Sequence, residues 1–454
     1  MSTTINPTKQ LPVLIHKQKI KHIHMKKIIP VLLLIVAFVN AMGQDKLSLS
    51  SAIAMGLENN YDLQLIRKSE ETAKVNNTPG NAGALPTISF DASATEDFNY
   101  NKNEDYRLQN ISPAINLNWV IFNGFSAKIT KQKLNELEEQ SKGNTAVLVE
   151  STIQDIILAY NSCLLAKEKE KVYKKLSKLS EDRYKKQQDS KEIGASTTYE
   201  SLQAKTSWLE DQSNYLQQKV NFDNAVRSLN YVLGEKNDLV WTFTDKLQVK
   251  AGDYKLEDLK QQLFENNQNL KNQYLNQSLL AKETALAQSG LYPSLKLNSG
   301  VSRTWIDYYY KGETANTNAN STDATIGLSL SFNIFNGGAT KRSIQLAKIS
   351  EENARIETDQ MKHSLSNELL QLYSKYNVQR AVLELADEQE AAAKLHLEMS
   401  EDKYNSGAIN SFNYRDVQIE YQNAAISKLN AISNLIETTT GLSRITGGII
   451  SEYK

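Results

Sequence analysis

The strongest constraint on this chain is an internal duplication, because two copies of one pattern must fold into two copies of one structural unit. Short motifs recur in the same order, the later ones at a slightly larger spacing: Glu58-Asn59-Asn60 as Glu265-Asn266-Asn267, Gly83 and Pro86 as Gly290 and Pro293, Ile121-Phe122-Asn123-Gly124 as Ile334-Phe335-Asn336-Gly337, and Gly194-Ala195 as Gly407-Ala408. The change of spacing falls in the segment between the second and third motifs. We therefore expect two repeats with one variable loop.

Each repeat begins as a helix followed by two strands. Apolar and polar residues alternate in 86–95, 111–119, 294–301 and 325–332, which is the period of a strand with two different faces. Each run has about ten residues, the length of a tilted strand that crosses a membrane. The alternation predicts a lipid-facing set and a lumen-facing set: Phe90, Leu117, Trp119, Leu328 and Leu330 in the first, and Asn116, Asn118, Lys296 and Asn298 in the second.

Four strands are too few to close a barrel that is wide enough for a pore. If these strands lie in a membrane, several chains must therefore share one barrel. The alternative is a pair of soluble hairpins that each cover a core with one face.

Two long helices follow the strands in each repeat. After Gly124 apolar residues recur every seven positions, as in Leu158, Leu165 and Val172, and this spacing indicates coiled-coil packing. The stretch from Gly124 to Gly194 contains no proline, so a single helix there would be about 100 Å long. The predicted fold class is mainly α with β, internally duplicated.

The repeats set the expected domain boundaries: 1–43 as an N-terminal extension and signal peptide, 44–234 as the first repeat, 235–255 as a linker, 256–447 as the second repeat, and 448–454 as a tail. Within 1–43, Lys26 and Lys27 precede an apolar run, 28–39, that is too short to span a bilayer and is typical of a secretory signal. We expect Met25 to be the true initiator.

Ionisable residues form no catalytic or ligand-binding pattern. Basic and acidic residues balance at 52 each, so the charge shows no nucleic-acid footprint. Only His363 and His396 follow the expected signal peptide, and no Cys or His pair has the spacing of metal ligands. Cys163 is the single cysteine, which excludes an intrachain disulfide. We expect no enzyme activity, no cofactor and no metal.

The element order, the duplication, the Pro-led strand and the Phe-Asn-Gly sequence that closes each second strand resemble the TolC family of outer-membrane efflux proteins, over roughly residues 47–447. The resemblance implies a homotrimer in which each chain gives four strands to one β-barrel, continued by a coiled-coil α-helical barrel into the periplasm. It implies an exit duct in the outer membrane, in contact with its lipid, for a tripartite efflux or type I secretion system. The implied partners are a periplasmic adaptor (membrane fusion) protein and an inner-membrane transporter.

The same resemblance suggests a gate at the periplasmic tips. Tyr404, Gly407 and Asp416 match the family's tip pattern, whereas Asn413 and Ile409 stand where the family often has Asp and Arg. The expected site consists of gate residues Glu200, Tyr404, Asn413 and Asp416, tip turns at Gly194 and Gly407, and strand-to-helix turns at Asn123-Gly124 and Asn336-Gly337. Because Ile409 cannot form an ion pair, we expect hydrogen bonds from Tyr404 and Asn413, rather than salt bridges, to hold the tip closed.

Other interpretations stay open on the sequence alone. One alternative is that Glu200 and Asp416 are ordinary carboxylates at helix starts, where the macrodipole favours them. Ser180 to Tyr184 echoes Ser400 to Tyr404 but lies further from its glycine, which allows one inserted heptad in the first hairpin. The alternative function is a periplasmic coiled-coil adaptor or scaffold protein of an export system. The sequence does not indicate the exported substrate or which pump and adaptor are partners.

Overall fold

The computed structural model describes residues 46–100, 105–235, 239–249, 252–310 and 317–452. The expected extension and signal peptide, 1–43, lie outside these ranges. The chain divides into a small unit, Met1–Lys46 with Val240–Thr242, and a large one, Leu47–Leu239 with Phe243–Lys454. The large unit holds every described helix and all four long strands, and the following paragraphs concern it.

The two repeats have the same six elements in the same order, which confirms the duplicated fold. The first contains α2 (Leu49–Asn59), α3 (Tyr61–Asn76), β2 (Thr87–Asn99), β3 (Tyr106–Asn123), α4 (Ser126–Glu192) and α5 (Thr198–Leu233). The second contains α6 (Leu256–Asn266), α7 (Gln268–Ser289), β5 (Ser294–Tyr310), β6 (Thr317–Ser331), α8 (Ala339–Asn405) and α9 (Ser411–Ile445). The remaining described elements are β1 (Lys46–Leu47), β4 (Thr242–Phe243) and α10 (Ile449–Glu452).

The single opening helix expected in each repeat is instead a pair of helices, so that expectation was wrong. The break falls at the repeated Asn-Asn sequence. Asn60 caps α3 by accepting a hydrogen bond from Leu63 N, and Asn267 caps α7 by accepting one from Leu270 N. A capping asparagine has extended rather than helical backbone angles, so the chain bends at this residue while the next helix begins.

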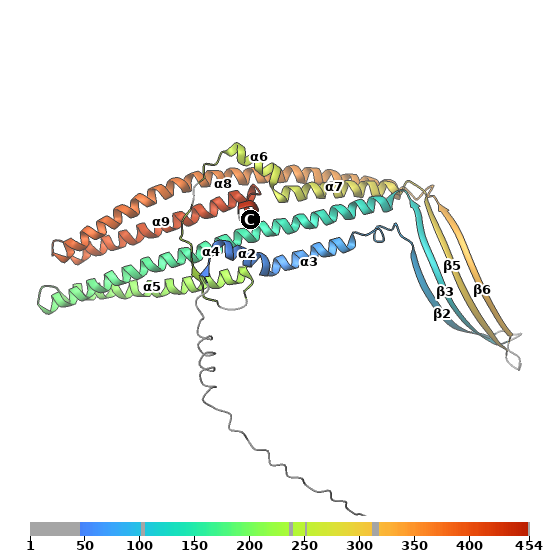
Figure 1. Ribbon diagram of the computed structural model, residues 1–454, viewed down its shortest axis with the longest axis horizontal. Coiled ribbons are helices and arrows are strands. Elements are labelled where there is room, and N and C mark those ends of the chain that lie inside the picture. The colour runs from blue at the N-terminus through green and yellow to red at the C-terminus, as the bar shows by residue number, and fades with distance from the viewer. Residues whose placement is uncertain (1–45, 101–104, 236–238, 250–251, 311–316, 453–454) are drawn as a thin grey trace, which may run out of the picture. The chain divides into compact units, whose positions relative to one another are not determined.

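The four long strands form one antiparallel sheet in the order β2-β3-β5-β6. They have 13, 18, 17 and 15 residues, longer than the ten expected, because pairing continues beyond the alternating runs. Figure 1 shows them side by side beyond the ends of α3, α4, α7 and α8. Within the part of the chain that the structure describes, β2 and β6 have no partner strand on their outer sides.

Each strand-to-helix turn lies at a predicted Asn-Gly pair. Asn123 Oδ1 accepts a hydrogen bond from Ala127 N, and Asn336 Oδ1 accepts one from Thr340 N, so each side chain satisfies an N–H at the start of a long helix. Gly124 has φ +66°, and a Cβ there would lie 2.3 Å from the carbonyl oxygen of Ser289. Glycine is therefore required at Gly124 both by backbone conformation and by close contact.

The long helices form two hairpins, α4–α5 and α8–α9, whose turns lie away from the sheet (Figure 1). Helix α4 also packs against α7 and α9, so it contacts both the second repeat's short helix and its long hairpin. Helices α4 and α8 each have 67 residues. The first helices of the two hairpins thus have the same length, so the first hairpin contains no inserted heptad. No described helix combines the length and apolar character needed to cross a bilayer.

Helix α4 buries a carboxyl group. Glu150 is 4% exposed, and its Oε1 has no hydrogen-bond partner among the described residues. Burial raises the pKa of Glu150 from 4.5 to about 7, although Arg444 and Lys271 oppose the shift. The folded protein therefore binds this proton more tightly than the unfolded chain does. Its contribution to stability is present in full below pH 4.5 and is lost as the pH rises through about 7.

We predict that Glu150→Gln makes the stability of the helical hairpins less dependent on pH between about 4.5 and 7, because the amide stays neutral. Thermal unfolding of the purified protein at several pH values measures this slope. The exposed Glu139 of the same helix, changed to Gln, is the control and should keep the wild-type profile. Parallel profiles for wild type and Glu150→Gln would contradict the prediction.

Candidate functional site

The hairpin ends turn at the two predicted glycines. Gly194 and Gly407 have φ +77° and +78°, which is the left-handed conformation that ends a helix without a Cβ clash. Ala195 N donates to Ser190 O, and Ala408 N donates to Lys403 O, so both turns close the same way. Helices α5 and α9 begin a few residues later, at Thr198 and Ser411.

Glu200 lies at the start of α5 and directs its carboxylate toward its own helix. Its Oε2 accepts from Thr197 N at 2.9 Å, while Thr197 Oγ1 accepts from Glu200 N, which completes a capping box. Ser196 Oγ lies 2.9 Å from the same carboxylate oxygen. These bonds, the backbone one first, lower the pKa of Glu200. In this chain alone, Glu200 therefore stabilises the turn at Gly194.

Tyr404 is buried and joins the two hairpins. Its ring stacks on Tyr414 with the centroids 4.7 Å apart, and its hydroxyl accepts a hydrogen bond from Gln187 Nε2 of α4 at 3.0 Å. Lys186 places its ammonium 4.4 Å from the Tyr404 ring centroid and donates to the Tyr404 carbonyl at 2.8 Å. Burial raises the pKa of Tyr414 to about 12, so the Tyr414 hydroxyl stays neutral. Ile409 packs against the same apolar cluster.

Asn413 and Asp416 are exposed on the first turns of α9. They lie three residues apart, so they share one face of the helix. The N-cap is Asn410, whose Oδ1 accepts hydrogen bonds from the backbone N–H groups of Phe412 and Asn413. The structure thus brings Tyr404 into a buried contact between hairpins, and it leaves Asn413 and Asp416 on the surface.

A buried ion pair, absent from the expectations, joins α5 to α9 near these turns. Arg415 makes two hydrogen bonds to the Asp211 carboxylate, at 2.6 and 2.9 Å, and the Asp211 side chain is 2% exposed. Arg183 of α4 is buried close by and donates to the carbonyl of Ser411 at 3.1 Å. Burial, and then Arg415, lower the pKa of Arg183 to about 10. The Asp211 carboxylate is therefore the negative charge that stabilises both the Arg415 and the Arg183 guanidinium groups.

A sequence signal for these residues exists in the seven-residue spacing. Arg183 follows the buried Leu176 by one heptad, and Asp211 lies one heptad from both Ala204 and Gln218, which are buried too. A charged residue at a heptad position that faces a neighbouring helix becomes buried, and a buried charge needs a partner of opposite charge. The partner's identity depends on which helices are neighbours.

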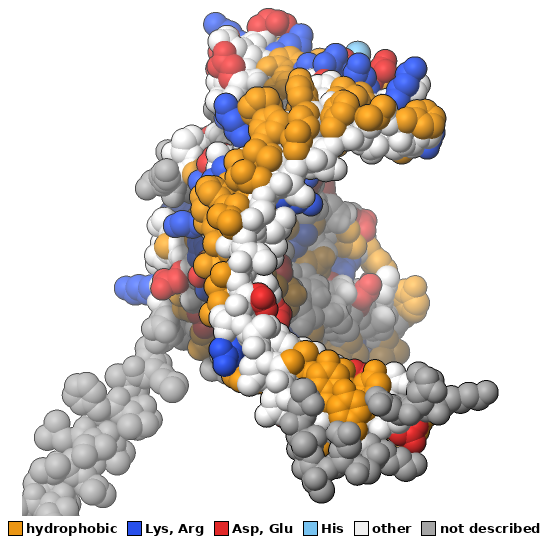
Figure 2. Space-filling model, turned by 90° about the vertical axis from the view of Figure 1, so that its right-hand side faces the viewer, with side chains coloured by type: hydrophobic (Ala, Val, Ile, Leu, Met, Phe, Trp, Pro, Cys, Tyr) orange, Lys and Arg blue, Asp and Glu red, His pale blue; other side chains and the backbone are white. Residues whose placement is uncertain are grey.

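The sheet has one apolar and one polar face. Its pairing register puts Phe90, Leu117, Trp119, Leu328 and Leu330 on one face, and Asn116, Asn118, Lys296 and Asn298 on the other. Figure 2 shows hydrophobic side chains as a band along the sheet. Phe90, Leu328 and Leu330 are about 70% exposed in the single chain. Soluble proteins rarely expose a continuous apolar surface of this kind to water. The two sets that alternation separated therefore lie on opposite faces.

The described residues outside these regions offer little chemistry. No group of His, Cys, Asp and Glu among them is arranged to hold a metal ion. Cys163 is buried, and burial raises the pKa of its thiol to about 12. A thiol with this pKa is a poor nucleophile at neutral pH.

Comparison with known proteins gives one family and a set of solved folds. The model of the family "Outer membrane efflux protein" matches residues 52–235 and 259–448. No curated protein matches the chain significantly. The fold is similar to the CmeC outer membrane channel of Campylobacter jejuni, with a TM-score of 0.75, 17% identity, and 88% of this chain and 85% of that chain covered.

Two further structures share the fold. The open state of the MtrE outer membrane channel of Neisseria gonorrhoeae has a TM-score of 0.71 at 14% identity, covering 88% of this chain and 89% of that one. The outer membrane protein VceC of Vibrio cholerae has a TM-score of 0.70 at 12% identity, covering 88% and 96%.

Proposed function

We infer the function from one premise: the chain belongs to the outer membrane efflux protein family, whose model matches both of its repeats. We propose that it is an exit duct, a channel in the outer membrane through which substrates leave the cell. Three copies form the channel, and their long hairpins extend into the periplasm as one helical barrel. The duct serves a tripartite efflux or type I secretion system, with a periplasmic adaptor and an inner-membrane transporter as partners.

The observation that carries the proposal is the sheet. It exposes a continuous apolar face, and both of its edge strands lack an outer partner in the described chain. An open edge in lipid would leave backbone N–H and C=O groups without hydrogen bonds, so a membrane sheet must close. Four strands do not close a pore on their own, whereas copies of the chain can pair β6 of one with β2 of the next. This requirement favours a shared barrel.

The alternative, a periplasmic adaptor or scaffold, explains the long hairpins but gives no use to an apolar face on strands this long. Fractionation of the cell envelope separates the two functions. The exit duct stays with the outer membrane after a carbonate wash, whereas a scaffold is released. Pull-down from the same envelope identifies the adaptor and the pump.

We predict that the detergent-solubilised protein has the mass of three chains and conducts ions in a planar bilayer. Native mass spectrometry measures the first property and single-channel recording the second. A single chain that still conducts would overturn the shared barrel.

We also predict that the hairpin ends act as the gate, with Glu200, Tyr404, Asn413 and Asp416 lining or bracing it. Tyr404→Phe removes the hydrogen bond from Gln187, worth about 1 kcal/mol, so the open fraction should rise about fivefold. Asp416→Ala removes a carboxylate that three chains would repeat around the axis, so the preference for cations should fall. Single-channel recordings measure both. Unchanged currents in both variants would return these residues to a purely local role.

A further inference from the structure

Three tyrosines form a cluster at the end of the sheet farthest from the helices. The register pairs Tyr106 of β3 with Tyr310 of β5, and Tyr308 lies two residues before Tyr310, so all three share one face. The Tyr106 ring centroid is 6.2 Å from that of Tyr308 and 5.9 Å from that of Tyr310. Asn99 Nδ2 donates to the Tyr106 hydroxyl at 3.0 Å, which holds that ring in place. We call Tyr106, Tyr308 and Tyr310 the tyrosine cluster.

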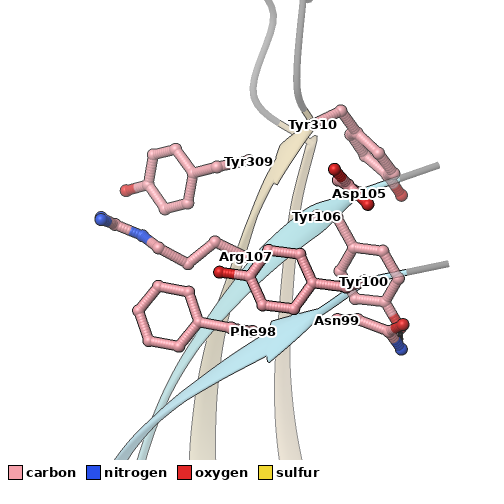
Figure 3. Close-up of a pocket in the computed structure, with 8 residues that line it drawn as sticks. All are labelled: Phe98, Asn99, Tyr100, Asp105, Tyr106, Arg107, Tyr309 and Tyr310. Atoms are coloured by element: carbon pink, nitrogen blue, oxygen red, sulfur yellow. Dashed lines mark hydrogen bonds between the residues drawn. The ribbon is translucent and has the colours of Figure 1, made fainter.

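The cluster lies on the polar face of the sheet, the face of Asn116 and Asn298. The aromatic residues of the apolar face are different ones. Figure 3 shows Phe98, Arg107 and Tyr309 on one side of the strands and Tyr106 and Tyr310 on the other. Phe98 and Tyr309 occupy the place where an aromatic girdle would meet the membrane interface. The tyrosine cluster has no such role, because it faces away from that surface.

The polar face is also acidic near the cluster. Asp97 pairs with Leu108 and Asn99 with Tyr106, so Asp97 is a diagonal neighbour of Tyr106 on this face. Asp91 and Asp323 lie on the same face further along the strands. Among the described strand residues of this face, the only base is Lys296, at the opposite end of β5. Aromatic rings beside a carboxylate, with no base nearby among the described strand residues of this face, favour a cation over an anion.

We propose that the tyrosine cluster, with Asp97, is an exit site that binds flat organic cations as they leave the channel. The proposal rests on the proposed function, since it takes the polar face to be the lumen. A cation over a tyrosine face is attracted by the ring's quadrupole, and a flat aromatic cation stacks on the ring as well. Three chains would place three such clusters around the mouth of the barrel.

Binding of ethidium, a flat aromatic cation, to the purified trimer in zwitterionic nanodiscs tests the site by fluorescence polarisation. The double variant Tyr308→Leu with Tyr310→Leu should raise the Kd about tenfold, whereas Tyr308→Phe with Tyr310→Phe should keep it, because phenylalanine retains the ring. Asp97→Asn should weaken binding as well. Tyr309→Leu is the matched control on the opposite face and should leave the Kd unchanged.

The outcomes separate this proposal from the proposed function. Native mass spectrometry of the same nanodiscs reports the trimer, and its absence would overturn the proposed function itself. If the trimer forms but the double leucine variant binds ethidium as wild type does, the exit site is wrong. Loss of binding in Tyr309→Leu instead would place the site on the outer surface. Equal affinity for pyrene-1-sulfonate, a flat anion, would refute selectivity for cations.

Discussion

Replacing Leu328 by arginine is expected to prevent most of the protein from assembling in the outer membrane. Leu328 is 68% exposed on the apolar face of β6 and pairs with Leu297 of the same face. In the proposed barrel this position faces lipid, where an arginine costs roughly 2 to 4 kcal/mol near the midplane. Three chains carry the substitution, so the cost to the trimer is correspondingly larger. The yield of trimer in washed outer membranes measures the effect.

Asn298→Arg is the matched control for Leu328→Arg. Asn298 follows Leu297 on β5, so it lies at nearly the same depth on the opposite face. An arginine there enters the lumen, where water and neighbouring polar groups solvate it. The variant should assemble as wild type does and change the single-channel conductance. Equal behaviour of the two variants would show that the faces are assigned wrongly.

Removal of the Asp211 carboxylate is expected to loosen the hairpin ends strongly. Asp211→Ala removes both hydrogen bonds of Arg415. It also leaves the buried Arg183 close to the Arg415 guanidinium without the carboxylate that balanced the two positive charges. Breaking a buried pair by removing one partner costs about 3 to 5 kcal/mol. Hydrogen exchange measured by mass spectrometry should show faster exchange in the ends of α4, α5, α8 and α9, and little change at the sheet.

Two further variants decide whether charge is the cause. Asp182 forms an exposed ion pair with Lys178 on α4. Asp182→Ala should therefore change the free energy of local opening, as derived from the exchange rates, by less than about 1 kcal/mol. Asp211→Leu combined with Arg415→Met removes both charges and should recover part of the loss. If Asp211→Ala exchanges as slowly as wild type, the ion pair does not hold the hairpins together.

Several features followed from local pattern. Strands, their two faces and the long helices were predicted because residues two or seven positions apart share a face whatever the rest of the chain does. The turns at Asn123-Gly124 and Asn336-Gly337 depend on their own residues, whereas the turns at Gly194 and Gly407 were expected from the repeat and from the resemblance to the family's tip pattern. The break at Asn60 was missed, although its signal was local too, since Asn-Asn was treated only as a marker of the repeat.

The candidate site was predicted less completely, because its contacts join distant segments. Tyr404 of α8 meets Gln187 of α4, and Asp211 of α5 meets Arg415 of α9, only after the two hairpins pack together through α4 and α9. An ion pair from Ile409 itself is impossible, whereas Arg415, six residues further along and on α9, finds its partner Asp211 on α5. Likewise, alternation shows that Tyr309 and Tyr310 face opposite ways, but the register is needed to show that Tyr310 joins Tyr106.

The sequence by itself determined the duplication, the type of each long element and the division of each strand into two faces, since these follow from short-range periodicity and backbone stereochemistry. Tertiary structure alone decided which helices are neighbours, which buried charges pair and which tyrosines meet. The physical reason is that the periodicity of a sequence places a residue on one face of its own helix or strand, whereas a contact also needs the face of a neighbouring element. The packing of whole helices and the register of whole strands determine which neighbouring face that is.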